Sequence, residues 1–313
     1  MKQILSRTLQ TGAGIVLIVL LVIYVDWSQV FQTWRRIPLS MALATCGIVA
    51  IALALVGVRL YILLRFAGLK HTLSMALRTT YTGAACSLVL PGQIGEDVAR
   101  FALLRSGAPG VQRRVVGVLL ADRVLGALAL AAITLLGLYA VPESISLPKN
   151  TLLFAVAAGT VAMGIACLWW KKRGQIQFRQ SATFQSLVNT KSRRHIAMAI
   201  VLSLIAQCID IATYWVIGLG IGIHQLGYIE YFAIIPWIYW LMVIPASIGG
   251  LGLREGAMAL LLSAYGVPAT LAIALSLAVY VIRASTSLCA AGLLFVGNGW
   301  GKLKNMQEQR SAA

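Results

Sequence analysis

Long runs of apolar residues alternate with short polar segments along the 313-residue chain. A helix needs about 20 predominantly apolar residues to cross the hydrocarbon core of a bilayer. The runs lack the polar stripe at helical spacing that a helix on the surface of a soluble protein carries. We therefore predict an all-α integral membrane protein with full spans at 11–25, 39–58, 115–140, 151–170, 196–222 and 269–296.

Two further apolar segments are interrupted, and the interruptions resemble each other. The first reads PGQIGEDVAR and ends at Arg100, and the second reads PASIGGLGLR and ends at Arg254. Both have proline first, Ile-Gly at the fourth and fifth positions, and arginine at the tenth. Proline removes a backbone donor and glycine permits turns. Paired helix breaks in corresponding halves of a membrane protein indicate a binding site at a repeat interface. The predicted break residues are Pro91, Gly92, Gly95, Pro245, Gly249, Gly250 and Gly252.

The basic residues indicate how the interrupted segments enter the membrane. Cytoplasmic loops are enriched in lysine and arginine, but the basic loops at 59–70 and 105–114 would face opposite sides if the segment between them crossed fully. The stretch 79–90 would also reach only about 18 Å as a helix, against a core of about 30 Å. We predict a re-entrant hairpin at 79–105 that enters from the cytoplasm, and a second at 229–264 that enters from outside, because its flanking loops are poor in charge.

These elements combine into one polytopic domain over 1–313, with about six full spans and two re-entrant hairpins. The first repeat is predicted at 39–140 and the second at 196–297. Because their hairpins enter from opposite faces, the repeats are inverted with respect to each other. Both termini are expected to be cytoplasmic.

Composition supports the membrane assignment and narrows the partners. Hydrophobic residues make up 59% of the chain and charged residues 11%, against about 25% charged in soluble domains. The net charge of +17 comes from short loops, where it sets orientation and attracts anionic phospholipids; nucleic-acid binding is not expected. The five cysteines lie inside apolar segments without metal-ligand spacing, and we expect neither a metal nor a cofactor.

Ionisable side chains inside the apolar segments are the candidate functional residues, because each costs about 2.5–3.5 kcal/mol to insert. Acids and bases occur there in similar numbers, which predicts mutual pairing around a polar cavity. Arginine suits phosphate because its planar fork donates two hydrogen bonds, and the half-helix that starts near Gly95 presents free N–H groups to an anion. The candidates are Glu96, Asp97, Arg100, Asp122, Arg123, Asp210, Arg254, Glu255 and Arg283.

The sequence leaves several pairings open. Asp97 and Arg100 have (i, i+3) spacing and could neutralise each other. The adjacent pair at 122–123 could bridge the first hairpin to the next span. Asp210 could pair with Arg283 or with the arginine at 254, or carry a proton. The neighbours at 254 and 255 are expected to face apart on a helix and to find separate partners.

At these positions the chain resembles the membrane flippase domain of lysylphosphatidylglycerol synthases and its stand-alone relatives. The resemblance rests on the Pro-Gly-x-x-Gly-x-Asp-x-x-Arg element at Pro91, the Asp-Arg pair at Asp122, the Pro-x-Ser-x-Gly-Gly-x-Gly-x-x-Glu element at Pro245 and the Tyr-x-x-Arg spacing at Tyr280. It implies a multi-pass protein of the bacterial inner membrane that moves a lipid headgroup between leaflets. The fused enzymes add a soluble transferase domain, which we do not find here, and lysyl transfer is not expected. Glu96 stands where glycine is common in the family.

The leading hypothesis is a lipid flippase-like transporter and not an enzyme. A phospholipid, an aminoacyl-phospholipid or a polyprenyl-linked sugar would each fit. The alternatives are a membrane-embedded lipid- or glycan-modifying enzyme with Asp97, Asp122 or Glu255 as general base, and an accessory scaffold. A second copy of the chain or a cell-envelope biosynthetic enzyme would be the protein partner. The residues predicted to bind substrate are the cations Arg100, Arg123, Arg254 and Arg283, and the acids Asp97, Asp122, Asp210 and Glu255 that would order them.

Overall fold

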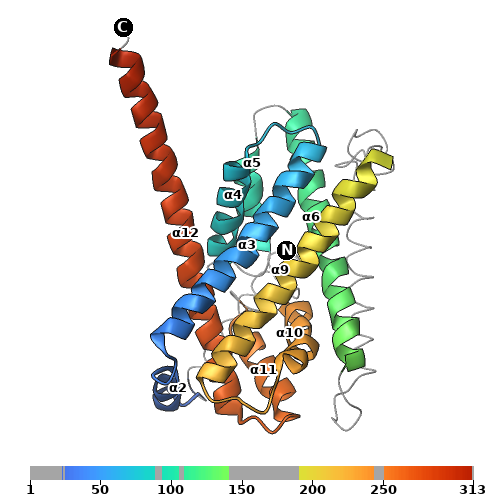
Figure 1. The fold of residues 1–313 in the computed structure, drawn as a ribbon, viewed down its shortest axis with the longest axis vertical. Coiled ribbons are helices and arrows are strands. Elements are labelled where there is room, and N and C mark those ends of the chain that lie inside the picture. The colour runs from blue at the N-terminus through green and yellow to red at the C-terminus, as the bar shows by residue number, and fades with distance from the viewer. Residues whose placement is uncertain are drawn as a thin grey trace, which may run out of the picture.

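The protein is all-helical throughout the part of the chain that the structure describes. This computed structural model describes residues 23, 25–88, 94–105, 109–140, 190–242 and 250–311. Every regular element in these ranges is a helix (Figure 1), which confirms the predicted fold class.

Four long helices form the frame: α3 (Leu39–Phe66), α6 (Pro109–Ala140), α9 (Thr190–Gly220) and α12 (Ala269–Ser311). Each contains a stretch long and apolar enough to cross a membrane. They correspond to four of the six predicted spans, while the predicted spans 11–25 and 151–170 lie outside the described residues. α3 and α9 run antiparallel and pack along much of their length (Figure 1).

Four short helices fill the space between the long ones: α4 (Leu73–Cys86), α5 (Ile94–Leu104), α10 (Tyr228–Met242) and α11 (Leu253–Ser263). The longest, α10, has 15 residues and extends about 23 Å, less than the hydrocarbon core. In Figure 1, α4 and α5 lie in one half of the molecule along its long axis and α10 and α11 lie in the other. This is the placement expected of two half-penetrating hairpins from opposite faces. α4 begins at Leu73, six residues before the predicted start of the first hairpin.

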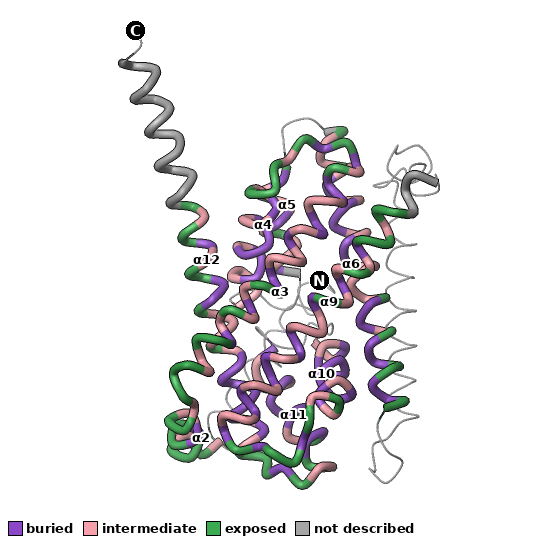
Figure 2. Tube along the Cα trace, in the orientation of Figure 1, coloured by how far each residue is buried: buried purple, intermediate pink, exposed green. Residues whose placement is uncertain are grey.

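The largest cluster of buried apolar residues surrounds the second hairpin. α10 buries Tyr231, Ile234, Ile235 and Ile238 completely, between α6, α9 and α11. Many residues on the outer sides of the long helices are exposed (Figure 2), and a large share of them are apolar, as on helices in contact with lipid. A second cluster, which includes Leu60, Leu64, Leu104 and Val115, packs the first hairpin against α3 and α6. The two clusters leave a polar zone between them.

A short helix, α2 (Trp27–Trp34), precedes α3 and packs against α12. The Asp26 carboxylate caps it by accepting hydrogen bonds from the backbone N–H groups of Ser28 (3.0 Å) and Gln29 (3.2 Å). Hydrogen bonding to Ser28 and Gln29 lowers the pKa of Asp26, so the cap stays ionised at neutral pH.

The contact between α6 and α10 depends on Gly137. A Cβ atom at this position would lie 2.6 Å from the Phe232 backbone oxygen and 2.8 Å from the Ala233 Cα, and backbone atoms cannot move aside cheaply. We expect Gly137→Ala to destabilise the protein by about 1–3 kcal/mol through overpacking. Gly117 lies on the same helix, and a Cβ atom added there would meet nothing within 4 Å, so Gly117→Ala is expected to leave stability unchanged or raise it by up to about 1 kcal/mol. Thermal unfolding in detergent measures both, and equal effects would contradict the close packing.

Candidate functional site

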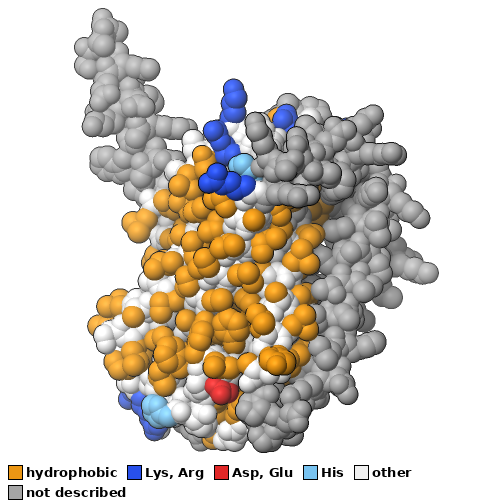
Figure 3. All heavy atoms as spheres, turned by 45° about the vertical axis from the view of Figure 1, so that its right-hand side comes forward, with side chains coloured by type: hydrophobic (Ala, Val, Ile, Leu, Met, Phe, Trp, Pro, Cys, Tyr) orange, Lys and Arg blue, Asp and Glu red, His pale blue; other side chains and the backbone are white. Residues whose placement is uncertain are grey.

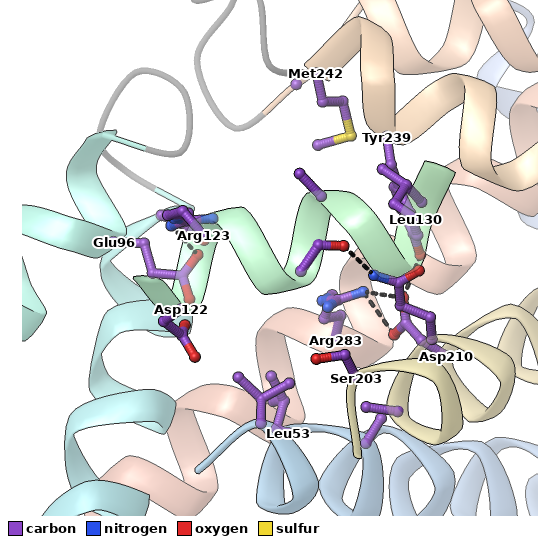
Figure 4. A pocket seen from close by; sticks show the side chains of 18 of the residues that line it. Leu53, Glu96, Asp122, Arg123, Leu130, Ser203, Asp210, Tyr239, Met242 and Arg283 are labelled. Carbon is purple, nitrogen blue, oxygen red and sulfur yellow. Dashed lines mark hydrogen bonds and ion pairs between the residues drawn. The ribbon is translucent and has the colours of Figure 1, made fainter. Parts of the chain in front are cut away.

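A polar cavity of about 300 Å³ lies between the two halves of the molecule (Figure 4). The N-terminal turns of α5 and α11, which follow the two predicted helix breaks, both reach it. The four long helices, the last residues of α10 and residues 87–88 enclose the rest. In the described residues, its charged lining side chains are Arg59 of α3, Glu96 and Arg100 of α5, Asp122 and Arg123 of α6, Asp210 of α9, Arg254 of α11, and Arg283 of α12.

Asp122 is the centre of the first charge cluster. Its Oδ1 accepts from Arg59 Nε at 2.7 Å and its Oδ2 accepts from Arg100 Nη1 at 3.2 Å. Arg59 also donates to the Ser203 hydroxyl at 2.7 Å, which connects α9 to the cluster. Only 2% of the Asp122 side chain is exposed. One buried carboxylate therefore neutralises cations from α3 and α5 together.

Arg123 joins the first hairpin to α6. Its Nη2 lies 2.9 Å from Asp97 Oδ1 and 3.1 Å from Glu96 Oε2, and its Nε donates to Asp97 as well. Glu96 also forms an ion pair with Arg100, one turn further along α5. The bridge from 122–123 to the hairpin is thus confirmed. The (i, i+3) pairing of Asp97 with Arg100 is not what forms: Arg100 pairs with Glu96 at (i, i+4) and with Asp122.

Asp210 of α9 finds its partner in Arg283 of α12. Arg283 Nη1 donates to both carboxylate oxygens, at 2.8 and 3.0 Å, and the Tyr239 hydroxyl of α10 donates to Oδ2. Of the two arginines that the sequence left open as partners, the structure pairs Asp210 with Arg283. About 34% of the Arg283 side chain is exposed, against 3% for Arg100, so Arg283 is the more accessible cation from the cavity.

The prediction that Arg254 and Glu255 face apart was wrong. Arg254 Nη2 lies 2.7 Å from Glu255 Oε1, and the Ser276 hydroxyl bridges the two residues, accepting from Arg254 Nε and donating to Glu255. The spacing argument holds inside a helix, but these residues open α11. Glu255 turns back to accept the Gly252 N–H at 2.6 Å, as an N3 acid in a helix cap does, and the long arginine side chain reaches its other oxygen.

The glycines of the second break support this turn. Gly250 and Gly252 have φ of 79° and 83°, in the left-handed region that only glycine enters without strain. Gly95 lies in the first turn of α5 and is buried. The remaining predicted break residues, Pro91, Gly92, Pro245 and Gly249, lie outside the described residues.

Comparison with known families agrees with this architecture. The family model described as "Lysylphosphatidylglycerol synthase TM region" matches residues 12–291. The chain belongs to this family. No match is found among the curated proteins. The match includes α2–α11 and most of α12, so the chain is a multi-pass membrane protein of a family with a role connected to membrane lipids.

Within this family member, the structure places the predicted site residues in two groups. Arg100, Asp122, Arg123, Asp210, Arg254 and Arg283 line the cavity. Asp97 and Glu255 do not line it, but each forms an ion pair with an arginine that does. Among the described residues, no group of three His, Cys, Asp or Glu side chains is arranged to hold a metal ion.

Arg59 is the charged cavity residue, among those described, that the sequence analysis missed. The predicted second span stopped at residue 58, which assigned Arg59 to a basic loop. In the structure α3 continues to Phe66, and Arg59 is a buried ion-pair partner of Asp122. The apolar residues Leu60–Leu64 that follow it were a usable signal, because an arginine between apolar runs lies inside the span and not at its end.

Proposed function

We propose that the protein moves a lipid headgroup between the leaflets through the central cavity. The observation that carries this proposal is that arginines from α3, α5, α6, α11 and α12 converge on one membrane-embedded space, each paired with a carboxylate in the described residues. Arginine binds phosphate through two parallel hydrogen bonds. Such a set offers a phosphate-bearing headgroup a polar route in a core that is otherwise hydrocarbon.

A cavity arginine can exchange one anionic partner for another. A headgroup phosphate that enters the cavity replaces one carboxylate–arginine contact with another contact of similar charge. Arg283 is the natural first contact, because its side chain is partly exposed and Asp210 engages it only through Nη1. The carboxylates released in this way can hold a cationic headgroup substituent. The apolar tails stay in the bilayer throughout.

A leaflet assay tests the proposal directly. The purified protein is reconstituted in liposomes with a fluorescent phospholipid, and the fraction accessible to an external quencher is followed with time. Wild type should move the label, and Arg283→Gln should slow this by about 10- to 100-fold, the effect of losing one hydrogen bond to a charged group. Arg105→Gln removes the same charge from an exposed position outside the cavity and should match wild type.

Mass spectrometry of the same lipids separates transport from catalysis. Translocation with unchanged lipid mass supports a transporter. A changed lipid mass would favour a membrane-embedded enzyme, and no movement by wild type for any of the phospholipid, aminoacyl-phospholipid or polyprenyl-linked probes would contradict the proposal.

A further inference from the structure

A second recess lies away from the central cavity, where the end of α3 meets the beginning of α9. It is formed by Tyr61, Ile62, Arg65 and Phe66 of α3 and by Arg194, His195 and Met198 of α9, none of which lines the central cavity. We infer that this groove binds one anionic phospholipid, with the phosphate on Arg65 and Arg194 and an acyl chain along α9. The inference does not depend on the proposed transport.

The charge of the groove is not neutralised within the described residues. Arg65 and Arg194 are exposed and form no ion pair with a described carboxylate. Acidic residues are scarce, nine in the whole chain, and Glu96, Asp97, Asp122, Asp210 and Glu255 are occupied by the arginines of the central site. Two cations brought together by different helices therefore offer a site to an anion from outside the described fold.

The walls of the groove suit a lipid better than a free ion. The rings of Phe66 and His195 lie 5.8 Å apart and close one side of it. Below the basic pair, Met198, Val201 and Ile205 are exposed on α9, and their spacing of three and four residues puts them on one helix face. Figure 3 shows a broad apolar surface with basic and histidine side chains at both of its ends. Aromatic and basic residues at this level are typical of the membrane–water interface.

The two arginines favour a lipid headgroup whose phosphate has no cationic group beside it. Guanidinium groups bind phosphate oxygens as a fork, whereas the choline of phosphatidylcholine would place a second positive charge beside two arginines. Both sides of the groove also come from helices that pack tightly against each other. A bound anionic lipid would therefore bridge α3 and α9 at the end predicted to be cytoplasmic.

Native mass spectrometry of the full-length protein in detergent, titrated with phosphatidylglycerol or phosphatidylcholine, tests the inference. Wild type should bind one phosphatidylglycerol selectively, and R65Q/R194Q should weaken this binding by about 30-fold, the effect of two basic residues at a membrane surface. The control is R35Q/R36Q, which removes two exposed arginines from the end of α2. It makes the same change in net charge and should bind as wild type does.

Three results would overturn the inference: unchanged binding by R65Q/R194Q, an equal loss in R35Q/R36Q, or equal binding of the two lipids by wild type. Thermal unfolding of each variant in lipid-free detergent checks that the fold is retained. R65K/R194K should keep part of the selectivity for phosphatidylglycerol, because lysine retains the charge and loses the fork geometry. If every variant, the control included, lost both lipid binding and melting temperature, this result would also count against a local site.

Discussion

Asp122→Ala is expected to destabilise the protein by about 3–5 kcal/mol, the largest stability effect that we predict for a single side chain. The substitution removes the one carboxylate that pairs with both Arg59 and Arg100. Both guanidinium groups are almost completely buried. Removing one partner of a buried ion pair leaves an uncompensated charge in a medium of low dielectric constant, which costs more than the pair itself contributed.

The measurement is the thermal or denaturant unfolding of purified variants in detergent. Asp97→Ala is the matched control, because 36% of the Asp97 side chain is exposed and its partner Arg123 keeps Glu96. We expect it to cost about 1 kcal/mol or less. The double variant Arg59→Met with Asp122→Ala should be more stable than Asp122→Ala alone, because Arg100 retains Glu96 and no other cation is stranded. A double variant no more stable than the single one would show that the loss does not come from unpaired charge.

Most charged residues of the site could be predicted from the sequence, because an ionisable side chain inside an apolar membrane segment is costly to insert and is therefore a candidate functional residue. The same argument placed Asp122, Arg123, Asp210 and Arg283 within helices, and all four line the cavity. The short helices followed from the two interrupted segments, since a stretch that cannot reach across the bilayer must turn back.

The pairing of these charges could not be predicted, because it depends on helix packing and on the length of side chains. Asp210 had two candidate arginines, and only the approach of α9 to α12 selects Arg283. Glu255 reaches its neighbour Arg254 because it first turns back to cap α11, a local geometry that helical spacing does not describe. Arg59 was missed for a simpler reason. The predicted second span ended just before this first charged residue, although α3 continues to Phe66, seven residues beyond Arg59.

The second large effect that we predict separates the two roles that Arg283 can have. Arg283→Asp and Asp210→Arg each place two like charges together, and both should reduce transport and stability. The exchange variant, Asp210→Arg with Arg283→Asp, restores an ion pair between α9 and α12 in the reverse direction. If Arg283 receives the headgroup phosphate, transport in this variant should stay reduced by about 10- to 100-fold, while the unfolding temperature recovers toward that of wild type.

The physical reason is position. Both positions line the cavity, but about 34% of the Arg283 side chain is exposed, against 10% for Asp210, which also accepts a hydrogen bond from the Tyr239 hydroxyl. The exchange therefore moves the cation from the more exposed position on α12 to the more buried one on α9. An ion pair that only stabilises the packing of α9 against α12 does so with the arginine on either helix. Full recovery of transport by the exchange variant would therefore show that Arg283 has a structural role and does not bind the headgroup. Arg283→Lys adds a finer test, since lysine keeps the positive charge and lacks the planar fork of arginine. If charge dominates, transport should fall less than in Arg283→Gln. If the phosphate requires two parallel hydrogen bonds, transport should fall as much as in Arg283→Gln.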